Sequence, residues 1–216
     1  MMLNRYLQIE TLSLVIIGDF NPVIFQPYWL FSKGLIRDDE AKNANVDILH
    51  NEIVRFELDW LKMEITRSRC ELSSSKVPYF EPLKDLVIGI FKILNETPIK
   101  SLGINHIFDL ELKSDAQYYE FGNKLAPLEL WKDDLRAPRL FQLEIFEYER
   151  KDGLEGSRKV RITPSDKSIS FGVAVNINNH FDLKKIDFTT HLEANWDESF
   201  IQAKIIVENL LNKTII

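Results

Sequence analysis

The stretch QIETLSLVIIG, residues 8–18, is the starting point for interpreting the fold of this chain. Its run of Leu, Val and Ile ends at Gly18, a pattern typical of a buried β-strand. A short helix interrupted by proline is predicted next, and Gly34 stands where a helix C-cap glycine is expected. Alternating polarity then indicates an antiparallel sheet with one wet face. Its three predicted strands span residues 46–49, 53–58 and 61–69.

The pattern changes period at residues 80–94, where apolar residues recur at the spacing of an amphipathic helix. The same order of elements then returns. We predict a long strand at residues 99–112 and a helix that begins at Ser114 and ends near Leu125. Three further strands, the first two joined by a hairpin around Gly153, are expected at residues 140–149, 158–163 and 168–181. A closing helix has one apolar face, formed by Trp196, Phe200, Ala203, Val207, Leu210 and Leu211.

This order predicts a duplicated β-α-β-β-β-α unit, with halves at about residues 7–95 and 98–212. The expected fold class is α+β, with a mixed or mostly antiparallel sheet and helices packed on one side. We expect residues 1–216 to form a single compact domain, because the breaks in the pattern are only turn-sized. These breaks are residues 73–76, 95–98 and 187–195.

Composition narrows the class of protein. The 216 residues are 45% hydrophobic, enough for a substantial core, and the net charge of −6 argues against a broad nucleic-acid or anionic-membrane surface. Cys70 is the single cysteine, so no intramolecular disulfide is possible. The apolar run at residues 12–17 is far shorter than the roughly 20 residues of a membrane helix. A cytoplasmic protein is therefore expected.

The histidines and serines give no catalytic or metal-binding pattern. No pair of histidines or cysteines has ligand spacing, so we expect no metal and no cofactor. His106 falls on the apolar face of its strand and is predicted to be a core histidine, bonded to the backbone or to a buried carboxylate. The serines lack the glycine frame of a nucleophile elbow. We predict no catalytic residue, and the sequence leaves the existence of an activity open.

A polar row near the end of the predicted 168–181 strand is the clearest candidate for a ligand site. Ile177 continues the inward-facing row, which places Asn176, Asn178 and His180 on the opposite face. Together with Asn105 these side chains would form a polar pocket. The alternative is a solvated face that leads into a turn, since Asn is common near strand ends.

A basic cluster surrounds the second-half hairpin and includes Arg150, Arg158, Lys159 and Arg161. Acidic residues interleave with it and weaken its field. We therefore predict a charge-balanced, exposed hairpin, because nucleic-acid affinity needs several uncompensated phosphate contacts.

The segment at residues 20–31 is rich in aromatic residues and contains two prolines. A short helix of this kind has no single narrow apolar stripe, so some rings should stay exposed. We predict that Tyr28, Trp29 and Phe31 contact a partner, because such rings are favoured anchors at protein interfaces. The alternative is that they close one end of the sheet.

Five blocks of the sequence carry a resemblance: FNPVIFQPYWL (20–30), PYFEPLKDLVIGIF (78–91), LGINHIFDL (102–110), FGNKLAPLELW (121–131) and VNINNHFDL (175–183). They resemble an uncharacterised, sporadically distributed bacterial protein family. Some members of that family lie near toxin–antitoxin or phage-defence genes. The resemblance implies an accessory role and supplies no catalytic residues.

Together these features predict a non-enzymatic protein-binding or assembly module that acts through protein–protein contact and forms a homo-oligomer. The resemblance further implies an accessory subunit of a bacterial toxin–antitoxin or antiviral defence system. The alternative is a small-molecule or nucleotide-binding protein, or an enzyme, with a pocket built from the Asn and His residues named above.

Overall fold

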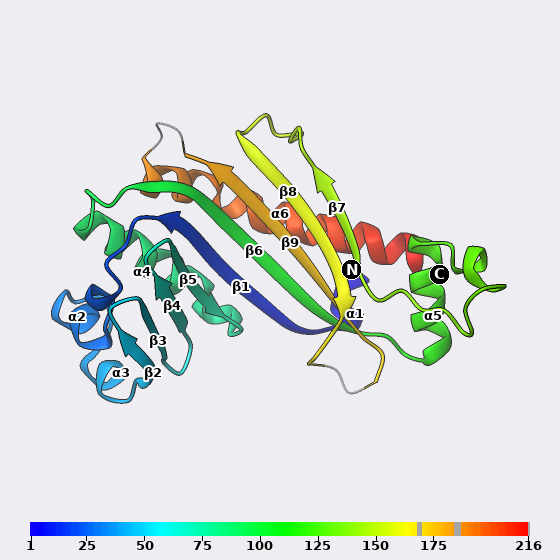
Figure 1. Ribbon diagram of the computed structural model, residues 1–216, viewed down its shortest axis with the longest axis horizontal. Coiled ribbons are helices and arrows are strands. Elements are labelled where there is room, and N and C mark those ends of the chain that lie inside the picture. The colour runs from blue at the N-terminus through cyan, green and yellow to red at the C-terminus, as the bar shows by residue number, and fades with distance from the viewer. Residues whose placement is uncertain (168–169, 184–186, 216) are drawn as a thin grey trace.

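The computed structural model describes residues 1–167, 170–183 and 187–215 (Figure 1). Within this part of the chain, nine strands form one antiparallel sheet in the order β2-β3-β4-β5-β1-β6-β9-β8-β7. Two long strands, β1 (Leu7–Gly18) and β6 (Ile99–Glu111), pair at its centre. The expected α+β class is therefore confirmed, and the described strand pairs are all antiparallel.

Among the other described elements, the helices α4 and α6 are the longest. Before β6 they are α1 (Leu3–Tyr6), η1 (Pro22–Ile24), α2 (Pro27–Ser32), α3 (Asp38–Lys42), β2 (Asn45–His50), β3 (Ile53–Glu57), β4 (Lys62–Thr66), β5 (Arg69–Ser74), η2 (Val77–Tyr79) and α4 (Phe80–Ile93). After β6 they are α5 (Asp115–Leu125), η3 (Leu128–Trp131), β7 (Leu143–Glu147), β8 (Gly156–Pro164), β9 (Gly172–Asp182) and α6 (Phe188–Thr214).

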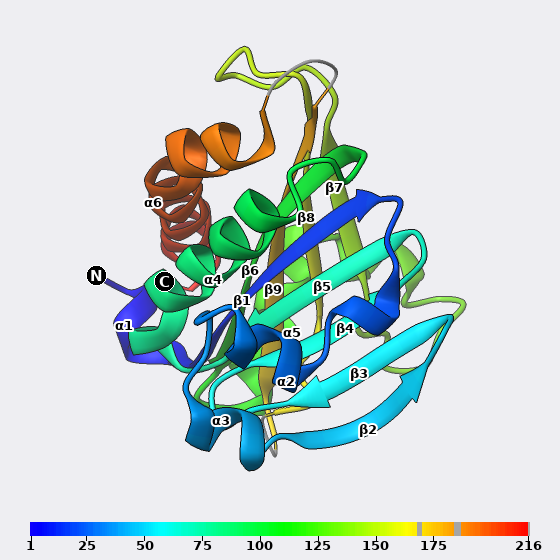
Figure 2. The same cartoon turned by 90° about the vertical axis from the view of Figure 1, so that its left-hand side faces the viewer.

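The sheet has two chemically different faces. Along β1, Leu12, Leu14 and Ile16 are fully buried on the face against which α4 and α6 pack, here called the helix-bearing face (Figure 2). The alternate positions point to the other side. There Ser13 of β1, Asn105 of β6 and Asn178 of β9 lie in one row, and this side is called the polar face. The period-2 alternation in the sequence thus separates a core side from a polar side.

The helix-bearing face holds the core, in which α4 and α6 lie side by side. Trp196 of α6 is almost fully buried and packs with its ring centroid 5.2 Å from that of Phe200. Its Nε1 donates a hydrogen bond to Glu81 of α4, so a polar contact fixes the two helices where their apolar faces meet. None of the described helices combines the length and the apolar character needed to cross a bilayer.

Local signals in the sequence place several element ends correctly. Gly34 follows α2 with φ +69°, a conformation that favours glycine. Ser114 caps α5, since its Oγ accepts a hydrogen bond from the backbone N–H of Gln117 at 3.2 Å. Gly153, in the connection from β7 to β8, and Gly156, the first residue of β8, both have positive φ, as expected for the predicted hairpin.

Three expectations about element boundaries are wrong. The expected third strand at residues 61–69 is two strands, because the chain turns after Thr66 and returns as β5 beside β1. Ser73 and Ser74, the first two residues of the expected break at 73–76, belong to β5, in which Cys70, Leu72 and Ser74 are buried. Residues 187–195 are likewise no break, since Asp187 is the N-cap of α6. The start of the predicted 168–181 strand falls partly on residues 168–169, outside the described residues.

Candidate functional site

A shallow pocket of about 160 Å³ lies on the polar face, over β6, β8 and β9. Strand register builds it, because Asn178 faces Asn105 on one side and Lys159 on the other. Asn178 Nδ2 donates a hydrogen bond to Asn105 Oδ1. The residues that line the pocket are Asn105, Lys159, Arg161, Asn176 and Asn178.

Three of the four predicted pocket residues therefore come together, and His180 does not line this pocket. His180 is on the same face but lies farther along β9, opposite Gly103 and Ser157. Its Nε2 is 3.4 Å from Asp182 Oδ1. Sequence reasoning missed Lys159 and Arg161 as pocket residues, because their position depends on the β8–β9 register.

The pocket offers both donors and acceptors. Asn176 Oδ1 is buried and has no hydrogen-bond partner among the described residues, and Asn105 is 8% exposed. The two cations are partly compensated, since Arg161 bonds Glu144 and Lys159 Nζ lies 3.9 Å from the same carboxylate. A small polar molecule that both donates and accepts hydrogen bonds suits this lining better than a strongly charged anion.

The three predicted partner-binding aromatic residues differ in exposure. Tyr28 is 75% exposed, whereas Trp29 and Phe31 are partly buried and pack against the core. The Trp29 ring lies 6.2 Å from that of Phe25, and the Tyr28 ring lies 6.3 Å from that of Phe31. Only Tyr28 projects freely, and the other two also help to close this end of the sheet.

Exposed apolar side chains are frequent in a segment that sequence reasoning did not select, from η3 to Tyr148, one residue after β7, and we call these side chains the 130–148 surface. They do not all share one face, since Ile145 lies opposite Val160 and Phe146 opposite Lys159, on the two sides of the sheet. Apolar side chains exposed in water can mark a site of protein contact where they gather. The exposed large apolar residues of the 130–148 surface are Leu130, Trp131, Leu135, Phe141, Ile145, Phe146 and Tyr148. The sequence signal that could have indicated these residues is the high proportion of apolar side chains in a stretch without regular alternation of polarity.

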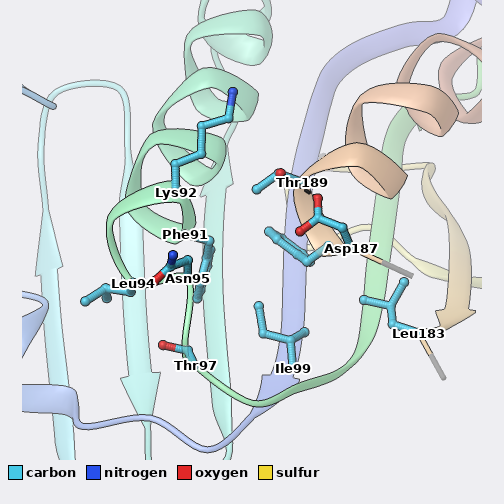
Figure 3. A pocket seen from close by; sticks show the side chains of 10 residues that line it. Phe91, Lys92, Leu94, Asn95, Thr97, Ile99, Leu183, Asp187 and Thr189 are labelled. Atoms are coloured by element: carbon cyan, nitrogen blue, oxygen red, sulfur yellow. Dashed lines mark hydrogen bonds between the residues drawn. The ribbon is translucent and has the colours of Figure 1, made fainter. Parts of the chain in front are cut away.

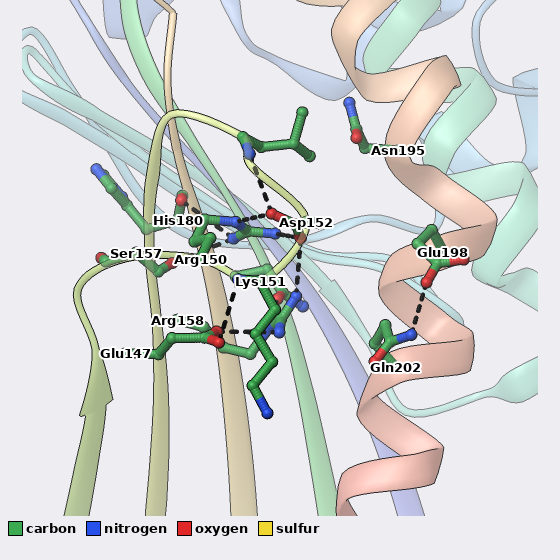
Figure 4. Close-up of polar contacts among 12 residues, drawn as sticks. Glu147, Arg150, Lys151, Asp152, Ser157, Arg158, His180, Asn195, Glu198 and Gln202 are labelled. Atoms are coloured by element: carbon green, nitrogen blue, oxygen red, sulfur yellow. Dashed lines mark hydrogen bonds and ion pairs between the residues drawn. The ribbon is translucent and has the colours of Figure 1, made fainter.

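The β7–β8 connection is held by a cluster of charged side chains (Figure 4). Arg150 Nε donates to Asp152 Oδ1 at 2.9 Å, and the Arg150 guanidinium lies 4.4 Å from the centroid of the Phe181 ring. Arg158 donates to Asn179 Oδ1 at 2.7 Å and to Glu147 Oε2 at 3.1 Å. The predicted exposed hairpin is thus wrong for its two central arginines, which are buried because each meets a carboxylate and a neutral partner.

The charged cluster changes the pKa values of two neighbouring groups. Hydrogen bonds from Arg150 hold the pKa of the Asp152 carboxyl below its usual value. Burial lowers the pKa of His191, whose ring lies 4.9 Å from that of Phe181, and the Arg150 charge acts in the same direction. His191 Nε2 and Asn179 Nδ2 have no hydrogen-bond partner among the described residues. The cluster pairs its own charges and fixes the end of the hairpin.

A second hollow, of about 430 Å³, lies between the end of α4 and the start of α6 (Figure 3). Phe91 and Ile99 point into it, and Lys92, Thr97 and Asp187 lie around it. The Asp187 carboxylate accepts the backbone N–H of Thr190 at 2.8 Å, and these helix-capping bonds lower its pKa. The acidic group of this hollow therefore serves as a helix cap.

His106 is buried on the helix-bearing face, as predicted, but the prediction that its ring forms a hydrogen bond is wrong. Neither ring nitrogen has a partner among the described residues. Burial lowers the pKa of His106 to about 3, so the ring is neutral at physiological pH. Within the same described residues, no group of His, Cys, Asp and Glu side chains could hold a metal ion.

The fold and these surfaces define an α+β protein with one nine-stranded antiparallel sheet, a helix-bearing core face and a polar face. Comparison of the sequence with protein-family models and with curated proteins finds no match.

Proposed function

We propose that this chain is a non-enzymatic protein-binding module that assembles with copies of itself or with a protein partner. The observation that carries the proposal is the 130–148 surface, where aromatic and aliphatic side chains stay in water. Phe141 is 76% exposed and Tyr148 is 80% exposed. Rings of this type supply much of the binding energy at protein interfaces when a partner covers them. Tyr28 and the partly buried Trp29 and Phe31 form a second candidate contact.

The proposed biological setting is an accessory subunit of a bacterial toxin–antitoxin or phage-defence system, acting in the cytoplasm. This part of the proposal rests on the resemblance of the sequence blocks alone. Co-purification of the full chain with the products of its neighbouring genes, followed by native mass spectrometry, tests it. A defined stoichiometric complex is the expected result, and no complex with any neighbour would contradict the setting.

The binding role is tested with the double variant Phe141→Ser, Tyr148→Ser. Both side chains are largely exposed, so their loss should leave the melting temperature unchanged while assembly weakens at least tenfold. The matched control is Val77→Ser, Ile93→Ser, which removes exposed apolar side chains elsewhere. Equal assembly of the double variant, the control and the wild type would overturn the assignment of the 130–148 surface.

The second candidate is a small-molecule or nucleotide-binding protein, favoured by the buried Asn176 Oδ1 at the polar-face pocket, which has no hydrogen-bond partner in the described part of the chain. A nucleobase, which both donates and accepts hydrogen bonds, matches three neighbouring amides. Thermal-shift titration with the four ribonucleoside monophosphates tests it, with Asn178→Leu as the pocket variant. A melting temperature that rises with ligand in the wild type and not in the variant supports this candidate. A melting temperature that no nucleotide changes would contradict nucleotide binding.

We also propose that the two halves arose by duplication. The support is that strands pair and connect in the same order in each half. β5 pairs with β1 and is followed by α4, and β9 pairs with β6 and is followed by α6. The first half has one strand more, since β2 lies outside β3. Superposition of β1, β5 and α4 onto β6, β9 and α6 should match direction and order, and a helix displaced to another strand would contradict it.

A further inference from the structure

The sheet ends in two edge strands of different character, β2 and β7. The pairing of β2 with β3 shifts register between Val46 and Ile48, a bulge that bends this edge. β7 pairs with β8 through all five of its residues without a shift. Neither edge strand contains Lys or Pro, the residues that commonly protect an edge, so the bulge in β2 is what distinguishes them. β7 is therefore the edge that is better suited to accept another strand.

We infer that β7 pairs antiparallel with β7 of a second copy, so that two nine-stranded sheets join into one. This inference rests on the proposed assembly role and names the partner and the contact. The two-fold axis would pass through Ile145, the middle residue of the strand, perpendicular to the sheet. Both helix layers then lie on the same side of the joined sheet, and the two polar faces become continuous.

The sequence of β7 favours this register. With the axis at Ile145, all five residues overlap: Leu143 faces Glu147, and Glu144 faces Phe146. No glutamate then lies directly opposite a glutamate. A shift that centres the pair on Glu144 or on Glu147 would place two carboxylates opposite each other, which is unfavourable.

The charges of β7 are already neutralised within its own copy. Glu147 Oε2 accepts from Arg158 at 3.1 Å, and Glu144 accepts from Arg161. Both carboxylates of β7 therefore already have arginine partners, and the strand needs no positive charge from the second copy.

At the proposed β7–β7 contact, apolar side chains lie on both faces of the sheet. Ile145, which is 56% exposed, lies opposite Val160 and so on the helix-bearing side. Phe146 lies on the polar side, and its ring is 4.5 Å from that of Tyr148. In a β7–β7 pair, Ile145 would contact its own equivalent, and cross-strand apolar pairs of this kind stabilise antiparallel sheets.

The test uses two opposite charges at the symmetry axis of the full-length protein. Ile145→Lys and Ile145→Glu each place like charges against each other, so each variant alone should dimerise at least tenfold more weakly than wild type. An equimolar mixture should recover dimer as a heterodimer, measured by light scattering and native mass spectrometry. The matched control is Leu49→Lys on the other edge strand, because Leu49 is 55% exposed, and this variant should dimerise like wild type.

The outcomes separate this inference from the proposed function. A wild-type dimer that persists unchanged in both Ile145 variants would overturn the β7 contact and leave self-assembly through another surface. Loss of dimer in each variant without recovery in the mixture would overturn the symmetric register. A wild type that stays monomeric at about 100 μM would overturn self-assembly itself, together with the β7 contact, and leave only a heterologous partner for the proposed role.

Discussion

The imidazole of His106 packs edge-on against the ring of Phe200, with centroids 4.3 Å apart, and is fully buried between β6 and α6. A neutral imidazole has one donor and one acceptor, and both lack partners among the described residues. The ring thus contributes packing while it pays the cost of desolvating two polar atoms. Two predictions follow from this contact.

The first concerns pH. His106 has a pKa of about 3 in the folded protein and an ordinary value of 6.5. Between these values the unfolded chain binds a proton that the folded chain does not, so stability falls as pH decreases. The slope should be about 1.4 kcal/mol per pH unit from this residue, beginning near pH 6.5. Urea denaturation between pH 7.5 and 5 measures it, above the range in which most carboxyls titrate.

The second concerns substitution. His106→Leu keeps most of the packing and removes two unpaired polar atoms, so the free energy of unfolding at pH 7.5 should rise by about 1–2 kcal/mol. The slope assigned to His106 should vanish in the same variant. His106→Ala instead opens a cavity and should destabilise, and His180→Ala on the polar face should change little. A His106→Leu variant as acid-sensitive as wild type would contradict this assignment.

The third concerns the charged cluster behind the β7–β8 connection. Arg158→Met should lower the free energy of unfolding by about 2–4 kcal/mol, because it strands Asn179 and two carboxylates in a partly dry site. The control is Arg55→Met, which breaks an exposed pair with Glu64 and should match wild type in stability. Equal effects of the two substitutions, measured by urea denaturation, would show that the cluster is not buried.

The fourth concerns two glycines of the same hairpin, Gly153 in its connection and Gly156 at the start of β8. Gly156 has φ +125°, and a Cβ there would lie 2.1 Å from the carbonyl oxygen of His180. Gly156→Ala should therefore cost about 3 kcal/mol or more, since the strand pair must shift. Gly153→Ala, with φ +72° and, apart from its chain neighbours, no atom of the described residues within 4 Å of the new Cβ, should cost about 1 kcal/mol. Melting temperatures in the reverse order would contradict the hairpin geometry.

The fifth separates Tyr28 from Trp29. Tyr28→Ser should leave the melting temperature unchanged, because that side chain lies mostly in water. Trp29→Ala should lower it, because the ring packs against the core beside Phe25. If both substitutions also weaken assembly in light scattering, this segment is an interface. Unchanged assembly would leave Trp29 and Phe31 as residues that close the end of the sheet.

Much of the secondary structure can be predicted from the sequence, because its signals are local. The alternation through residues 99–111 indicates β6, and Ser114 and Gly34 mark helix ends where the structure has them. β5 was missed for a local reason as well. Its polar residues Ser73 and Ser74 resemble a turn, and only pairing with β1 and β4 makes them a strand.

The candidate site could be predicted only in part. The face that carries Asn176, Asn178 and His180 follows from alternation along one strand, since side chains on a strand change face at each residue. That Lys159 joins Asn178 in a pocket, while His180 lies farther along, depends on the register between β8 and β9.

The sequence did not indicate β5 or the first turns of α6, but it did indicate most of the other elements, the buried side of strands such as β6 and the positions of the hairpin glycines. These properties arise from side-chain periodicity and local backbone sterics. The tertiary structure alone decided which strands are neighbours, that Arg150 and Arg158 are buried, and that β7 and the 130–148 surface remain uncovered. Strand pairing and burial depend on many contacts between residues that are distant in the chain, and a local sequence pattern does not specify those contacts.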